Sequence, residues 1–201
     1  MMGKTHLTMG IAVTALAFHP TDIASWLLTI VGGAVGGTVA DIDSVKTDYK
    51  HDALIGQALA VFILGASLLI DYGKDIGILS SIAIRNSGFV IVGGVVYLIL
   101  YIVGFFSRHR TFTHSLFALA LFSFSVYLIC PSIATFYAVG YLSHLVLDIL
   151  NKKTIPLFFP VGKGFCLGWF YANKIANKCF FWTGFVSIFL LMVHWIIVQI
   201  A

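Results

Sequence analysis

The sequence contains a series of apolar runs, and five of them are long enough to cross a lipid bilayer as helices. A hydrocarbon core about 30 Å thick is spanned by roughly 20 helical residues. The five runs cover residues 23–40, 53–71, 88–106, 112–130 and 133–150, a sixth covers 181–200, and a shorter one covers 6–18. The 201 residues are 60% hydrophobic and only 10% charged, which is too apolar for a soluble domain of this size. We therefore predict an all-α, polytopic transmembrane bundle of about six to seven helices that forms one membrane-embedded domain.

The basic residues are distributed unequally between the two sides of the membrane. If the chain crosses at each run, ten of the 12 lysines and arginines share the side of Lys4, and Lys74 and Arg85 lie opposite. The positive-inside rule then places the basic side, and with it the N-terminus, in the cytoplasm. Topology therefore accounts for the net charge of +4 without a nucleic-acid partner.

Residues 151–180 follow the run that ends at residue 150 and mix lysines with aromatic side chains such as Phe165, Trp169 and Tyr171. Such a mixture is typical of the membrane–water interface. We predict that 151–180 is a cytoplasmic interfacial segment within the single domain. It could admit a lipid to the protein or serve only as an anchor.

The same topology brings histidines and aspartates from distant parts of the chain to the cytoplasmic ends of the helices. His144 and Asp148 are four residues apart and therefore share one helix face. Ionisable residues at bilayer depth usually face a bundle interior, and imidazole with carboxylate suits zinc, manganese or iron. We predict a site for one or two divalent ions, with zinc preferred. The candidate ligands are His6, Asp41, Asp43, His114, His144 and Asp148, and His109 is a further ligand or a general acid.

Each of these residues also has a purely structural interpretation. Asp41 and Asp43 could end a helix in water, and His144 with Asp148 could form a polar contact between helices. His114 with Thr113 and Ser115 could belong to the N-terminal cap of the following helix. Thr111 or Thr113 could form that cap without a histidine. The shared membrane face favours the metal site over these separate explanations, and in that case Thr113 and Ser115 would support the ligands.

Cationic side chains near the cluster indicate an anionic substrate. The guanidinium groups of Arg108 and Arg110 suit a phosphate or a carboxylate, although they could also contact lipid headgroups. Lys4 and Lys46 lie on the same face and are candidate substrate-binding residues.

The order of short motifs resembles the YdjM-like inner-membrane proteins, which are described as metal-dependent hydrolases. The motifs are GKTHLTMG (3–10), ADIDSVK (40–46), RHRTFTHS (108–115), GYLSHLVLDIL (140–150) and IPLFFP (155–160). The resemblance implies an inner-membrane location, metal dependence and hydrolysis. Its matched residues are His6, Asp41, Asp43, His109, Arg110, Thr113, His114, Ser115, His144 and Asp148. One departure is Ser44, which stands where the family often has a histidine. His51 could take the place of that missing histidine.

Three functions are consistent with the sequence. The first is a hydrolase at the cytoplasmic face that cleaves a lipid phosphoester with a metal-activated water, with Arg108, His109 and Arg110 taking part in catalysis. The set of histidines and aspartates is also similar in kind to that of zinc-dependent phospholipase C enzymes. The second is a transporter or ion-binding protein that uses the cluster as part of a pathway. The third is a structural or regulatory protein whose basic face binds a partner.

Overall fold

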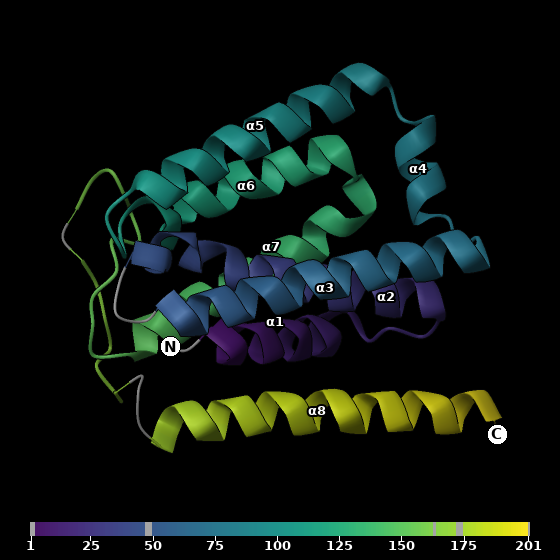
Figure 1. Ribbon diagram of the computed structural model, residues 1–201. Helices are drawn as coiled ribbons and strands as arrows, with labels where there is room; N and C mark the ends of the chain where they lie inside the picture. The colour runs from purple at the N-terminus through teal and green to yellow at the C-terminus, as the bar shows by residue number, and fades with distance from the viewer. Residues whose placement is uncertain (1–2, 47–49, 163, 172–174, 201) are drawn as a thin grey trace.

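The computed structural model describes residues 3–46, 50–162, 164–171 and 175–200 (Figure 1). This part of the chain folds as an all-α bundle with eight α-helices. They are α1 (Gly3–Phe18), α2 (Ile23–Val39), α3 (Lys50–Lys74), α4 (Ile78–Ile84), α5 (Ser87–Phe106), α6 (Leu116–Ile129), α7 (Pro131–Leu150) and α8 (Ile175–Ile200). Two short 3-10 helices, η1 (Ala40–Lys46) and η2 (Phe112–His114), interrupt them. Five stretches are long and apolar enough to cross a membrane, namely Ile23–Ser44, α3, α5, α7 and α8. The predicted helical membrane bundle is confirmed.

Two helices differ from the sequence prediction for local reasons. The connection expected at 72–87 contains α4, which begins where the buried carboxylate of Asp71 accepts hydrogen bonds from the backbone N–H groups of Ile78 and Leu79. The run predicted to span from residue 112 instead gives the shorter helix α6. Its start is set by Ser115, whose side chain accepts a hydrogen bond from the backbone of Ala118, and the preceding residues form η2.

Glycines bring α1, α2 and α7 into close backbone contact at the centre of the bundle. A Cβ atom on Gly36 would lie 2.2 Å from the carbonyl oxygen of Tyr137 in α7, and one on Gly37 would lie 2.6 Å from the carbonyl oxygen of His6 in α1. Small residues allow this approach, which is a common way for helices to pack in membranes. The contact also sets α1 and α7 beside the end of α2, where the candidate ligands lie.

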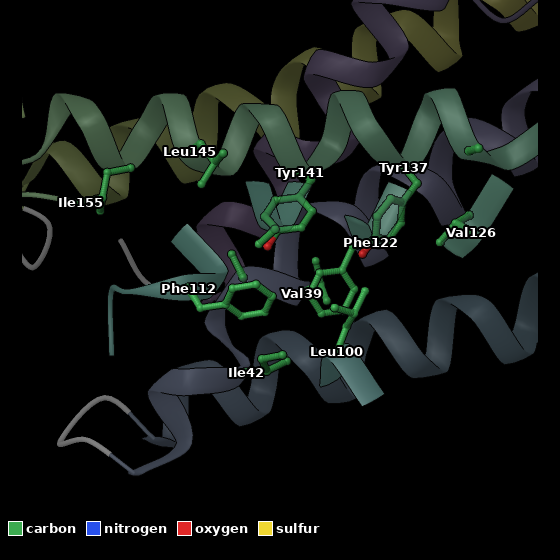
Figure 2. Close-up of a cluster of buried hydrophobic side chains, with 13 residues drawn as sticks. Val39, Ile42, Leu100, Phe112, Phe122, Val126, Tyr137, Tyr141, Leu145 and Ile155 are labelled. Carbon is green, nitrogen blue, oxygen red and sulfur yellow. The ribbon is translucent and has the colours of Figure 1, made fainter. Parts of the chain in front are cut away.

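A cluster of buried apolar side chains joins η1, α5, α6 and α7 (Figure 2). Its labelled members include Ile42, Phe122, Tyr137 and Tyr141, and each of these side chains is almost fully buried. The cluster fixes η1 against α5 and α7. It therefore positions the aspartates that η1 carries.

After α7 the chain runs through an irregular segment that folds back over the end of the bundle. Ile155 and Phe165 exchange backbone hydrogen bonds, and Ile155 is buried in the apolar cluster. The backbone of Leu157 accepts a hydrogen bond from Leu116 at the start of α6. The helix predicted at 181–200 begins earlier, at Ile175, so only residues 151–174 connect α7 to α8.

Candidate metal centre

The His/Asp cluster predicted from the sequence is assembled from four elements at one end of the bundle. His6 comes from α1, the two aspartates of the D-x-D motif from η1, His114 from η2, and His144 with Asp148 from the last turns of α7. These six side chains are buried, whereas His109 in the loop before η2 is 25% exposed. Residues separated by 142 positions in the sequence therefore meet in one polar centre.

Two histidines of this centre direct ring nitrogens at each other. Nδ1 of His144 lies 2.8 Å from the carbonyl oxygen of Gly37, which can only accept, so Nδ1 carries the proton and Nε2 holds the lone pair. Nδ1 of His114 lies 3.3 Å from a carboxylate oxygen of Asp43, which leaves its Nε2 facing inward in the same way. The two Nε2 atoms are 3.4 Å apart. Two lone pairs at this distance would repel each other, so either a proton on His114 or a metal cation must lie between them.

The carboxylates of Asp41 and Asp148 complete this arrangement. An oxygen of Asp148 lies 3.3 Å from Nε2 of His114, and an oxygen of Asp41 lies 3.9 Å from Nε2 of His144. Ligand atoms about 2 Å from a tetrahedral zinc ion are separated by roughly 3.3 Å. The separations in the centre are therefore close to those that a single ion requires.

His6 supplies a second observation in favour of a bound ion. Its ring is stacked on His144 with centroids 3.6 Å apart, and Nε2 lies 3.5 Å from Asp148. Although both ring nitrogens are fully buried, neither has a hydrogen-bond partner among the described residues. Apart from the 3.5 Å contact with Asp148, this buried imidazole has lost the hydrogen bonds that it makes to water, and coordination to a metal would replace them.

Two groups of three side chains within the described residues could each hold a metal ion. One consists of His6, His144 and Asp148, and the other of Asp41, His114 and His144. All members are buried, and His144 belongs to both groups. Five of the six predicted ligands thus lie where an ion could be bound, and the donor set of nitrogen and oxygen suits the metals expected from the sequence.

Asp43, the sixth predicted ligand, lies behind the ligands and connects them to the surrounding loop. One of its oxygens accepts hydrogen bonds from the backbone N–H of Arg110 and from the hydroxyl of Thr113, both at 2.8 Å. The other oxygen lies 2.9 Å from Nδ1 of His109. Asp43 also contacts Nδ1 of the candidate ligand His114. A carboxylate that orients a metal-binding histidine through Nδ1 is a frequent arrangement in metal sites.

The protonation state of His114 depends on the neighbouring carboxylates of Asp43 and Asp148. Burial alone would lower the pKa of His114, but the carboxylates of Asp43 and Asp148 outweigh it and raise the pKa to about 9. His114 must lose that proton to bind a metal through Nε2. The same carboxylates therefore attract either a proton or a metal cation to this position.

Arg110 lies at the edge of the centre, and its guanidinium group is already engaged. It contacts a carboxylate oxygen of Asp148 at 2.9 Å and donates to the carbonyl oxygen of Lys153 at 3.0 Å. Its backbone has a positive φ of 60°, which is uncommon for a residue with a side chain. Arg108 is exposed, and its side chain makes no hydrogen bond or ion pair within the described residues.

The remaining predicted residues lie farther from the ligands. Ser115 caps α6, and Lys4 is exposed with its ammonium 5.8 Å from the centre of the Phe181 ring. The side chain of Lys46 lies outside the described residues. His51 is exposed at the start of α3, whereas Ser44 is buried beside the D-x-D aspartates, with its hydroxyl 3.0 Å from Nδ1 of His109.

The comparison with known proteins agrees with this arrangement. The family described as "YdjM inner membrane protein" matches residues 1–201, which is the whole chain. The chain belongs to the YdjM family. No curated protein and no solved structure matched it. It is therefore a multi-pass inner-membrane protein of this family, with a buried His/Asp cluster that could bind metal.

Two residues of this YdjM family member, Gly37 and Tyr141, support the centre although the sequence analysis did not single them out. The carbonyl of Gly37 fixes the ring of His144, and a backbone carbonyl carries no sequence signal. Tyr141 donates a hydrogen bond of 2.6 Å to the carbonyl oxygen of Thr113 and so holds η2 against α7. Helical spacing could have identified Tyr141, because it precedes His144 by three residues and Asp148 by seven.

Proposed function

We propose that the protein is a metal-dependent hydrolase that cleaves a phosphoester of a membrane lipid at the cytoplasmic face. The observation that carries this proposal is the pair of inward-facing Nε2 atoms of His114 and His144, 3.4 Å apart between buried carboxylates. His6, Asp41 and Asp148 would hold the ion together with these two histidines. A divalent ion in such a site supplies Lewis acidity and lowers the pKa of a bound water to about 7.

His109 and Asp43 form a dyad suited to moving a proton at the edge of the centre. Because an ionised carboxylate only accepts hydrogen bonds, Nδ1 of His109 carries the proton that points to Asp43. Nε2 is then the nitrogen that can take a proton from water or return one to a leaving oxygen. His109 is partly exposed, unlike the buried candidate ligands, so a substrate can reach it.

The cationic residues around the centre have two proposed roles. Arg108 is exposed and would bind the anionic group of the substrate. Arg110 would hold Asp148 in place, because its guanidinium already contacts that carboxylate. A phospholipid fits such a site, because its anionic headgroup would lie near these residues and its apolar chains in the bilayer.

The distribution of buried acids and bases gives less support to transport. A pathway needs ionisable groups through the depth of the membrane. Within the described residues, Asp71 is the one buried aspartate or histidine outside the cluster, and its carboxylate is used to begin α4. The polar chemistry is therefore concentrated at one end of the bundle.

The test combines elemental analysis with a hydrolysis assay on protein purified in lipid nanodiscs. Wild type should contain bound divalent metal and release phosphate or headgroup from phosphatidic acid or phosphatidylglycerol. His114→Ala and Asp148→Ala should lose both the metal and the activity, and His51→Ala should keep both. Normal hydrolysis by both centre variants would rule the proposal out.

A further inference from the structure

An apolar cavity lies in the half of the bundle away from the metal centre. Its volume is about 250 Å³, and its walls come from six of the helices, α2 to α7. The lining includes Val31 and Val35 of α2, Ser67 of α3, Ile82 of α4 and Tyr137 of α7. In Figure 1, α5 and α6 diverge from α3, and α4 joins the far ends of α3 and α5. The cavity occupies the interior of this wedge.

The near part of the cavity, along α2, lies within the depth of one leaflet from the centre. Val35 precedes Asp41 by six residues, so the near end of the cavity is about 9 Å from the centre along α2. Val31 precedes Asp41 by ten residues, or about 15 Å along α2. Ile133 of α7 precedes Asp148 by 15 residues, which places the far wall about 22 Å away. Half of a hydrocarbon core is also about 15 Å thick. A lipid whose headgroup lies at the centre therefore carries its chains to the depth of the cavity.

The apolar lining of the cavity favours a hydrocarbon chain over water. An empty space of this size leaves its lining atoms without contacts, and water has no polar partners on an apolar wall. An apolar cavity of about 150 Å³ is already large enough to hold benzene in another protein. The lipid-facing sides of α3 and α5, with Val61, Phe62 and Ile99 exposed, flank the wedge. Lipid chains are thus the medium next to it.

The apolar cluster separates the cavity from the centre, so a lipid cannot pass straight through the protein. Val126 and Tyr137 line the cavity, whereas Tyr141 holds η2 at the centre, and all three belong to this cluster (Figure 2). On the membrane side, η1 packs against α5 where Ile42 meets Gly104. A lipid would therefore lie along the wedge outside this contact, with its headgroup towards the exposed edge at His109.

We propose that this cavity binds one hydrocarbon chain of the lipid that is cleaved at the metal centre. This assignment rests on the proposed function, which supplies the lipid phosphoester. The cavity holds the chain, the exposed edge of the centre holds the headgroup, and the distance between them selects lipids with long chains.

The experiment fills the cavity and follows both bound lipid and chain-length preference. Ser67→Leu and Ile82→Phe place extra volume in the cavity from two different helices. Gly65→Leu is the matched control on α3, because a Cβ atom there meets no atom within 4 Å. Native mass spectrometry of protein released from nanodiscs counts the lipid molecules retained. Hydrolysis of phosphatidic acid with long or short chains gives the KM and kcat for each, and elemental analysis checks the metal.

We expect the two filled variants to keep their metal and kcat, to retain several-fold less lipid and to show a KM several-fold higher for the long-chain lipid only. Gly65→Leu should behave as wild type. Unchanged lipid retention and unchanged KM values in both filled variants would overturn the proposal. If wild type hydrolyses neither lipid, the proposed function fails and the cavity lipid is not a substrate. Loss of retained lipid in the filled variants would then still locate a bound chain in the cavity.

Discussion

The helices α2 and α8 are both long and apolar, yet they occupy opposite environments. Most of the span that contains α2 is buried between α1 and α7, whereas α8 lies mainly along α1 and, of its described residues, buries only Asn177 and Gly184 (Figure 1). The bilayer is as apolar as leucine, so hydrophobicity does not drive either helix into the protein interior. Four glycines in α2 permit close backbone contact, and α8 has one, Gly184, where it meets α1. Because α5 also has four glycines and is mostly exposed, glycines that lie against the backbone of a neighbouring helix, rather than apolarity or glycine content, mark the helix that becomes the scaffold of the centre.

The largest difference between the buried helices and α8 should appear when a histidine is removed from each. His144→Ala deletes the residue shared by both candidate metal groups, so metal affinity should fall more than about 100-fold. His194→Ala in α8 removes an exposed ring and should leave the affinity unchanged. Isothermal titration with Zn²⁺ and Mn²⁺ measures both. Equal affinities would mean that the cluster is a polar network and not a metal site.

A smaller loss is expected when the support behind the ligands is weakened. Asp43→Asn keeps the size of the side chain but removes the charge that orients His114, and metal affinity should fall about 10-fold to 100-fold. Asp52→Asn, in the first turn of α3, provides a control with the same change of charge. The titration used for His144→Ala applies here too. A loss as complete as in His144→Ala would indicate that Asp43 itself binds the ion.

Stability should respond to glycine replacement in α2 but not in a lipid-facing helix. Gly36→Ala forces a Cβ atom against the backbone of Tyr137, which should destabilise the fold by about 1–3 kcal/mol. Gly94→Ala in α5 meets no atom within 4 Å and should be neutral or slightly stabilising. Thermal unfolding in a mild detergent reports the two values. Matching stabilities would show that α2 and α7 tolerate a wider separation.

The smallest effect is expected on the exposed face of α8. Ile197 is 58% exposed, and Ile197→Ala should change the free energy of unfolding by less than about 0.5 kcal/mol. The same unfolding assay detects any larger change. A loss above 1–2 kcal/mol, about that of Gly36→Ala, would reveal that this face packs against another protein chain.

The sequence predicted which residues form the candidate centre, but it did not predict which of them contact one another. Helix periodicity and topology were enough to bring His6, His144 and Asp148 to one membrane face, because each lies at a definable end of an apolar run. The sequence did not separate Asp43 from the other candidate ligands. That distinction depends on which atoms surround its carboxylate, and the D-x-D spacing alone cannot show that Arg110 and Thr113 donate to it.

The fold shows the same limit in α4 and α6. Their bounds depend on Asp71 and Ser115, whose capping hydrogen bonds compete with the apolar pattern around them. Apolar content identifies a helix that can enter the membrane, but local hydrogen bonds set where it begins. The hydrogen bond from His144 to the carbonyl oxygen of Gly37 could not be predicted either, since every residue has a backbone carbonyl group.

The sequence by itself determined that this chain enters a membrane as helices and carries the candidate ligands to one end of them. Apolar run length and residue order are sufficient for that, since backbone polar groups in a bilayer must bond within a helix. Only the tertiary structure decided which of these side chains face one another, which one supports the others, and where an apolar cavity remains. Those outcomes depend on close contacts between distant segments, which glycines permit and packing then fixes.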